Sequence, residues 1–220
     1  FEHMTGRTRL ACMMMYASGL RIGDLLQLRV KDLSFERKQI TVHASKGDKQ
    51  RYVSFPGVLH EAVKHQICQV ESVWRDDLQH HSNGVSLPDA YRRKARRAAS
   101  KLAWYYLFPS DSLCRDEDGL LVRHHLHGST VSRALADAVE RAGVHKRVTT
   151  HILRHSYATH AHEGGVPLRS IQQLLGHADS RTTEIYVHAD KEGVTRAKSP
   201  IEALLANPPR IKGKLRVFAG

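Results

Sequence analysis

The sequence predicts an α+β fold, a mostly helical domain that carries a small antiparallel β-sheet in the form of a hairpin. Apolar residues recur at spacings of three and four over most of the chain, which is typical of amphipathic helices. Residues 40–55 break this pattern with two runs rich in β-branched and aromatic residues around a Gly-Asp turn. The length of 220 residues, 41% of them hydrophobic, fits one domain with a buried core.

The first elements are short. A helix is expected at residues 10–17, where closely spaced methionines fit core packing better than a binding stripe. Ser-Gly at 18–19 ends it, and a second short helix begins at Arg21. The two strands are expected at residues 40–44 and 51–55, with a turn between them.

A helix at residues 57–78 is followed by a segment of different character. Residues 81–89 have the composition of a loop, and a basic, aromatic helix is expected from Pro88 to Tyr106. Cations suit phosphates, and aromatic rings suit unstacked bases. The candidate contacts for nucleic acid are Arg92, Arg93, Lys94, Arg96, Arg97 and Trp104. A solvated helix face stays open as the alternative, and Trp104 and Tyr105 could instead pack in the core.

The second half is expected to be helical. Helices are predicted at residues 129–142, capped by Ser129 or Thr130, at 151–163, and from Pro167 to a stop at Gly176. The tail, residues 199–220, contains one short apolar helix and then a basic run. That helix could pack on its own chain or dock on a neighbouring protomer.

Charge and cysteine content narrow the function classes. The chain has 34 Lys and Arg residues against 22 Asp and Glu residues, a net charge of +12. This charge predicts a polyanionic partner such as nucleic acid. Three distant cysteines predict reduced thiols in a cytosolic protein rather than disulfides or a cysteine-zinc site. No apolar run is long enough for a membrane span, and no signal peptide is expected. The chain begins within a helical pattern without a cap, so we expect a fragment.

The stretch HILRHSYATH, residues 151–160, raises the question of a metal site. His151 and His155 are four apart and would share one helix face, as in helical zinc sites. A zinc hydrolase helix has glutamate after its first histidine, whereas Ile152 follows here. Arg154 would repel a cation and no carboxylate is near, so no metal is expected. A second cluster, His124, His125 and His127, is interpreted as loop histidines that are solvated or contact phosphate.

A phosphate site fits the same stretch better. His151 and Arg154 are three apart on a helix and can face one oxyanion, with arginine as a bidentate donor. A phosphoryl-transfer site needs more cationic groups, because its transition state spreads charge over several oxygens. Further candidates stand at predicted turns or loops: Arg21, Lys46, His177 and, nine residues later, Tyr186.

These motifs carry a family resemblance. The strings GLR (19–21), HILRH (151–155) and LLGH (174–177), with Lys46 in a hairpin turn and Tyr186 last, resemble the catalytic domain of the tyrosine recombinase (phage integrase) family over about residues 10–190. The segments 28–35, 87–110, 123–143 and 195–200 resemble the integron integrases in particular. This second resemblance implies that an inserted helix at about 86–108 helps bind folded single-stranded recombination sites through extrahelical bases. His125 is a further candidate DNA contact.

The resemblance implies a catalytic role for each motif residue. Tyr186 would attack the scissile phosphate and form a 3′-phosphotyrosine, while Arg21 and Arg154 clamp the non-bridging oxygens. A phenol, with a pKa near 10, needs a base or a strongly cationic site to attack at neutral pH. Covalent storage of the phosphodiester energy makes a cofactor unnecessary, so none is expected.

The remaining roles follow from the same resemblance. His177 would donate to the phosphate, Lys46 would protonate the leaving 5′-oxygen, with Lys49 as a rival, and His151 would act as the base toward Tyr186. Asp24 matches a position where the family often has an acid, and we expect it to orient a neighbouring catalytic side chain. His155 is interpreted as structural.

The resemblance also sets expectations for domains and partners. Residues 1–220 would form the catalytic domain, without the N-terminal DNA-binding domain and the first catalytic helix of the family. The partner would be DNA, with a homo-tetramer in the full-length family, in the bacterial cytoplasm at the nucleoid. Two alternatives stay open: a type IB topoisomerase-like nicking and closing enzyme, and a non-catalytic DNA-binding remnant. Ala161 stands where the family usually has a bulky residue, so looser packing is expected there.

Overall fold

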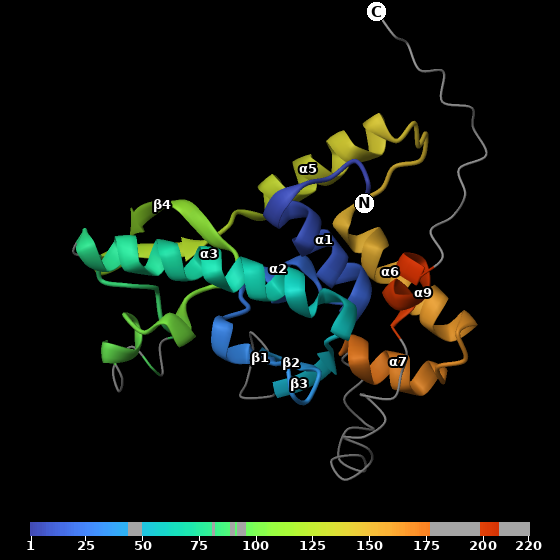
Figure 1. Cartoon of the computed structure of the whole chain (residues 1–220), viewed down its shortest axis with the longest axis horizontal. Coiled ribbons are helices and arrows are strands. Elements are labelled where there is room, and N and C mark those ends of the chain that lie inside the picture. The colour runs from blue at the N-terminus through green and yellow to red at the C-terminus, as the bar shows by residue number, and fades with distance from the viewer. Residues whose placement is uncertain (44–49, 81, 89–90, 92–95, 177–198, 207–220) are drawn as a thin grey trace, which may run out of the picture.

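Helix α1 (Gly6–Ser18) is the centre of the molecule (Figure 1). The computed structural model describes residues 1–43, 50–80, 82–88, 91, 96–176 and 199–206 and confirms the α+β class. Every residue of α1 from Leu10 to Ser18 is buried, because α3, α5, α6 and α9 pack on different sides of it. The sequence predicted a single apolar face, but a helix that is apolar all round is buried all round.

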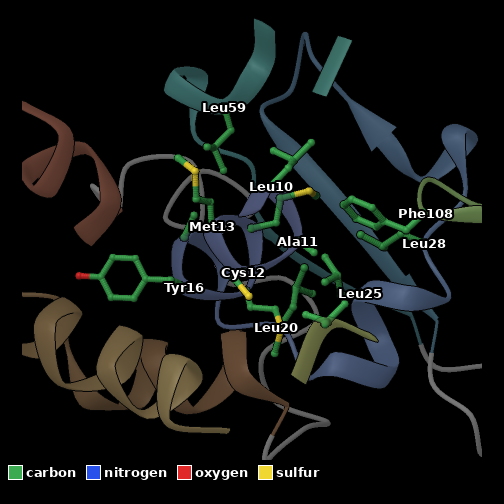
Figure 2. Close-up of a cluster of buried hydrophobic side chains, with 14 of the residues drawn as sticks. Leu10, Ala11, Cys12, Met13, Tyr16, Leu20, Leu25, Leu28, Leu59 and Phe108 are labelled. Carbon is green, nitrogen blue, oxygen red and sulfur yellow. The ribbon is translucent and has the colours of Figure 1, made fainter. Parts of the chain in front are cut away.

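The main core surrounds this helix. Figure 2 shows Leu59, Leu28 and Phe108, from other segments, beside the α1 side chains. The methionines of α1 are in this core, as the sequence predicted. Burial raises the pKa of Cys12 to about 12, so this cysteine is a thiol at neutral pH and only packs.

A glycine turn leads from α1 to α2 (Ile22–Leu26). Gly19 has φ 64°, a left-handed conformation that favours glycine. A Cβ there would lie 2.6 Å from the ring of Tyr157 on α6. The turn can therefore approach α6 closely, and Arg21 follows it directly as the N-cap residue of α2.

A small sheet follows, with strand order β1-β2-β3 and antiparallel pairing. Strands β2 (Gln39–His43) and β3 (Gln50–Ser54) confirm the predicted hairpin. Ile40, Val42 and Val53 are buried beneath it. The strand β1 (Leu33–Ser34), which follows the 3-10 turn η1 (Val30–Asp32), was not predicted because two residues are too short to show a period.

Helix α3 (His60–Gln79) follows the 3-10 turn η2 (Gly57–Leu59) and buries the predicted apolar face through Val63 and Val70. A second hairpin, β4 (Pro109–Arg115) and β5 (Leu121–His125), lies near the C-terminal end of α3 (Figure 1). The sequence did not predict this hairpin, because its strands are largely polar and half-exposed. His124 and His125 therefore belong to a strand, not to a loop as expected.

The predicted helix from Pro88 to Tyr106 is only partly wrong: Tyr91 is helical, but the segment from Arg96 to Tyr106 is not α-helical. Its described part contains two 3-10 turns, η3 (Arg96–Ala98) and η4 (Leu102–Trp104), with extended backbone at Lys101 between them. Tyr105 is fully buried, and Tyr106 bridges to Arg29 of another segment. Tyr105 has extended backbone, with φ −63° and ψ 145°, and is buried together with its neighbour Tyr106, so tertiary packing overrides the local helical preference here.

The C-terminal helices α5 (Gly128–Arg141), α6 (Thr150–Glu163) and α7 (Leu168–Leu175) confirm three predicted helices. The predicted cap of α5 was wrong: His127 is the N-cap, and its ring accepts from the backbone N–H of Ser129. Ala161 is buried beside Tyr157 and Leu175, so the small residue leaves no exposed gap.

The tail helix α9 (Pro200–Ala206) packs on its own chain. Ile201 is fully buried, and the Ser199 hydroxyl donates to the Ala17 carbonyl at 2.7 Å. Within the described residues, no helix is both long enough and apolar enough to cross a bilayer.

A buried ion pair joins α3 to the second hairpin. The Arg123 guanidinium on β5 forms two bonds to the carboxylate of Asp77, which is 1% exposed. The hydroxyl of Tyr105 donates to the same carboxylate at 3.1 Å. This carboxylate and burial raise the pKa of Tyr105, with burial as the larger cause. The three groups satisfy one another and attach Tyr105 and the second hairpin to α3.

We predict that Asp77→Asn lowers the free energy of unfolding by about 3–5 kcal/mol, because it leaves the buried Arg123 charge without a counter-ion. Urea denaturation followed by circular dichroism measures this loss. Asp111→Asn is the control, since it removes the 80% exposed partner of Arg7 and should cost at most about 1 kcal/mol. Equal losses in both variants would contradict the prediction.

Candidate active site

A pocket of about 390 Å³ lies where α1, α2, β2 and α6 meet. It brings together three of the predicted catalytic residues, Arg21, His151 and Arg154, which are up to 133 positions apart in the chain. The residues that line it are Met15, Arg21, Ile22, Gly23, Asp24, Gln27, His43, Thr150, His151 and Arg154. Its polar lining is mainly cationic or imidazole, with Asp24 as the one carboxylate among these residues.

Arg154 is the buried cation of the pocket, with only 4% exposure. Its Nη1 donates to the Gly19 carbonyl at 2.6 Å, and its Nη2 donates to the Leu175 carbonyl at 2.5 Å. Burial, followed by the charges of Arg21 and Arg51, lowers its pKa to about 10. The group is still charged at neutral pH, and its charge is short of a full counter-ion. An anion in the pocket would therefore be bound favourably.

Arg21 points to the same place from the start of α2. Its guanidinium donates to the carbonyls of Leu175 and Gly176 over long distances of 3.4 and 3.5 Å. The last carbonyls of a helix carry partial negative charge, so the C-terminal end of α7 attracts both arginines. Because these bonds are long and Arg21 is exposed, its guanidinium can turn to a ligand at low cost.

Asp24 holds an arginine that the sequence analysis missed. Its Oδ2 accepts from Nη2 of Arg51 at 2.5 Å and from the backbone N–H of Arg21 at 3.3 Å. Arg51 lies on β3, five residues after Lys46, and that proximity was the only signal in the sequence. The expected role of Asp24, to orient a neighbouring side chain, thus has a concrete partner in Arg51.

His43 was also missed. It ends β2 and lines the pocket, while its Nε2 lies 3.0 Å from Oδ1 of the buried Asp32. Lys31 approaches the same oxygen at 3.2 Å. The sequence offers no signal for His43, because a lone histidine at a strand end is usually only solvated.

The two histidines that suggested a metal are both exposed on α6, with ring centroids 4.7 Å apart. His151 lines the pocket, whereas His155 is not among its lining residues. Across the part of the chain that the structure describes, no three His, Cys, Asp or Glu side chains are grouped closely enough to hold a metal ion.

Three expected catalytic residues, Lys46, His177 and Tyr186, lie outside the described residues, and so does the rival Lys49. The same holds for the candidate DNA contacts Arg92, Arg93 and Lys94 and for the side chain of Arg96. Arg97 is exposed at a 3-10 turn. Of the six expected catalytic residues, the structure therefore describes three, Arg21, His151 and Arg154.

The aromatic residues of the inserted segment divide into two kinds. Tyr105 is core, whereas Trp104 is only partly buried. The ammonium of Lys31 lies 4.4 Å from the centroid of the Trp104 ring, and the exposed Tyr91 ring lies 4.9 Å away. Trp104 therefore forms a surface-accessible aromatic and cationic cluster of the type that can stack on a base.

His125 lies at the end of β5, half-buried, with its Nδ1 2.8 Å from the Leu126 carbonyl. Burial lowers its pKa, so this imidazole is neutral at pH 7.

We predict that Arg154→Lys destabilises the fold by roughly 1–3 kcal/mol, because an ammonium cannot reproduce the fork to Gly19 and Leu175 and leaves a buried carbonyl unpaired. The thermal stabilisation by orthophosphate, compared with chloride at equal ionic strength, should also fall. Arg141→Lys is the control, since the exposed Arg141 also donates to a carbonyl, that of His3 at 2.8 Å. Equal effects of both substitutions on unfolding and on phosphate stabilisation would contradict the assignment.

Known proteins match this chain over most of its length. An integrase/recombinase of Escherichia coli is 40% identical over 202 residues, which are 91% of this chain and 60% of that protein. The tyrosine recombinase XerA of Thermococcus onnurineus is 35% identical and covers 87% of this chain and 54% of its own length. The chain thus spans little more than half the length of the curated relatives it matches.

Solved structures agree with the fold. A crystal structure of XerA recombinase superposes with a TM-score of 0.53 at 28% identity, covering 93% of this chain and 60% of that one. XerH recombinase, bound to its difH substrate before cleavage, has a TM-score of 0.53 at 24% identity, a likeness of fold, and covers 83% of this chain and 42% of its own. The sequence profile of the phage integrase family matches residues 2–193. Together with the 40% identical integrase/recombinase, this match establishes that the chain belongs to the phage integrase family, the tyrosine recombinases.

Proposed function

We propose that this chain is the strand-cleaving part of a site-specific DNA recombinase. The observation that carries the proposal is the convergence of Arg21, Arg154 and His151 on one pocket, with both arginines bonded to the Leu175 carbonyl of α7. Two guanidiniums and an imidazole suit a phosphodiester, because they neutralise the charge that builds up on its non-bridging oxygens. The net charge of +12 suits DNA as the partner.

The reaction we propose is a transesterification at phosphorus. His151 takes the proton of the Tyr186 phenol, whose oxygen bonds to the phosphorus and displaces the 5′-oxygen. Lys46 gives that leaving oxygen a proton, and His177 donates to the phosphate. The phosphotyrosine that forms conserves the bond energy, so a 5′-hydroxyl can reverse the step without ATP, metal or cofactor.

Within the family we propose the integron integrase type, which inserts and excises gene cassettes. The support is the inserted segment at about 86–108, which presents Trp104 with Lys31 and Tyr91 at the surface. Such a cluster suits an extrahelical base of a folded single-stranded site. We further propose that residues 1–220 are the catalytic domain of a longer recombinase that acts in the bacterial cytoplasm, as a homo-tetramer on DNA.

Covalent trapping tests the chemistry. We predict that this chain forms a covalent complex with a double-stranded site that is nicked near the scissile phosphate, because loss of a short fragment prevents religation. The complex is measured as a band shift in denaturing gels. Tyr186→Phe should abolish it, while Glu71→Gln on α3, which is not among the residues lining the pocket, should leave cleavage unchanged.

The alternatives give different outcomes in the same assay. Absence of a complex with every integron-type site would favour a non-catalytic DNA-binding remnant. Complexes with unrelated duplexes, together with relaxation of supercoiled plasmid, would favour a topoisomerase-like activity. A complex that survives Tyr186→Phe would refute Tyr186 as the nucleophile.

A further inference from the structure

Arg51 occupies an unusual position beside the pocket. It projects from β3, where Val42 of β2 is its cross-strand partner. Its ion pair with Asp24 is short, 2.5 Å, and both side chains are only about one-fifth exposed, 20% and 18%. A charge-assisted bond with so little solvent is far less screened than a surface ion pair. The first hairpin is thereby attached to the start of α2, directly beside Arg21.

Arg51 also packs on the end of α7. Gly176, the left-handed cap of that helix with φ 61°, has no side chain, and a Cβ there would lie 3.0 Å from Cδ of Arg51 and 3.2 Å from its Nε. The carbonyls of Leu175 and Gly176 are the ones to which Arg21 and Arg154 donate. Arg51 thus contacts the same helix end to which Arg21 and Arg154 donate.

The charge balance around this point is incomplete. Three guanidiniums, those of Arg21, Arg51 and Arg154, share one carboxylate, that of Asp24. The charge of Arg51 contributes to the lowered pKa of Arg154, after burial and Arg21. The Nε of Arg51 is buried and has no hydrogen-bond partner among the residues that the structure describes. The three cations together leave net positive charge beside the pocket.

We infer that Arg51 is a positioning residue of the recombination site, which sets Arg21 through Asp24 and sets the end of α7 through its contact with Gly176. The inference rests on the proposed function and adds to it a residue outside the expected catalytic set. Lys46 precedes Arg51 on the same hairpin, and His177 follows Gly176 directly in the sequence. One side chain therefore contacts the segments, or adjoins the residues, that would supply Arg21, Lys46 and His177.

The test is the single-turnover rate of covalent-complex formation on the nicked site, at saturating DNA. Arg51→Gln should lower this rate by about 10- to 100-fold, the size that loss of an outer-shell partner has in metal sites. The apparent Kd for DNA should change by less than about threefold. Arg51 is proposed to position the catalytic side chains and not to bind DNA itself. Arg51→Lys, which keeps the charge and loses the fork, should give an intermediate rate.

A double-mutant cycle distinguishes positioning from general stabilisation. Arg51→Gln combined with Asp24→Asn should be no slower than the slower single variant, because both break the same contact. The matched control is the pair Glu71 and Arg75 on α3, joined at 2.6 Å but exposed and distant from the pocket. Glu71→Gln and Arg75→Gln should leave the cleavage rate unchanged.

Each outcome decides the matter. If the wild-type chain cleaves and folded Arg51→Gln cleaves at the same rate, the Arg51 inference is wrong while the proposed function stands. Additive losses in the cycle would also refute it. If Arg51→Gln does not fold, the rate of folded Arg51→Lys decides, and a wild-type rate there refutes the inference. If the wild-type chain forms no covalent complex, the proposed function fails and the role of Arg51 fails with it.

Discussion

The buried guanidinium of Arg154 is the interaction on which the arrangement of the site depends. It extends from α6 and donates to the carbonyl after α1 and to the last carbonyl of α7, which are 135 and 21 residues away. An unpaired buried charge is costly, so the segments that supply these acceptors are held in place together. Gly19 makes this possible, since any larger residue would collide with Tyr157.

The same constraint explains why the pocket is cationic. Arg21 and Arg51 reach the end of α7 that Arg154 already binds, and only Asp24 opposes them among the residues lining the pocket. The partial negative charge of the helix-end carbonyls lowers the free-energy cost of placing the three arginines together, but it does not neutralise their positive charge. The free protein therefore carries unbalanced positive charge at the point where we propose that a scissile phosphate binds, and such charge would be preorganised for an anionic transition state.

Polar contacts attach residues 82–125 to the rest of the fold. Arg29 donates to the carbonyls of Trp104 and Ser86, and Arg123 with Asp77 holds the second hairpin against α3. Lys31 touches both the Trp104 ring and Asp32, and Asp32 in turn contacts His43 at the pocket. A continuous set of contacts thus runs from the exposed aromatic cluster to the pocket wall.

The sequence by itself determined most of the helices, the first hairpin and three residues that the structure brings together in one pocket. Period and caps are local, so α3, α6, α7 and the hairpin could be read directly, and ordered motifs singled out Arg21, His151 and Arg154. Only the tertiary structure decided the backbone conformation of residues 96–106, where Tyr105 and Tyr106 are buried although the sequence has a helical pattern. It also decided Arg51, whose partner Asp24 is 27 residues away. Contacts between distant residues are set by the packing of whole elements, and no local spacing encodes them.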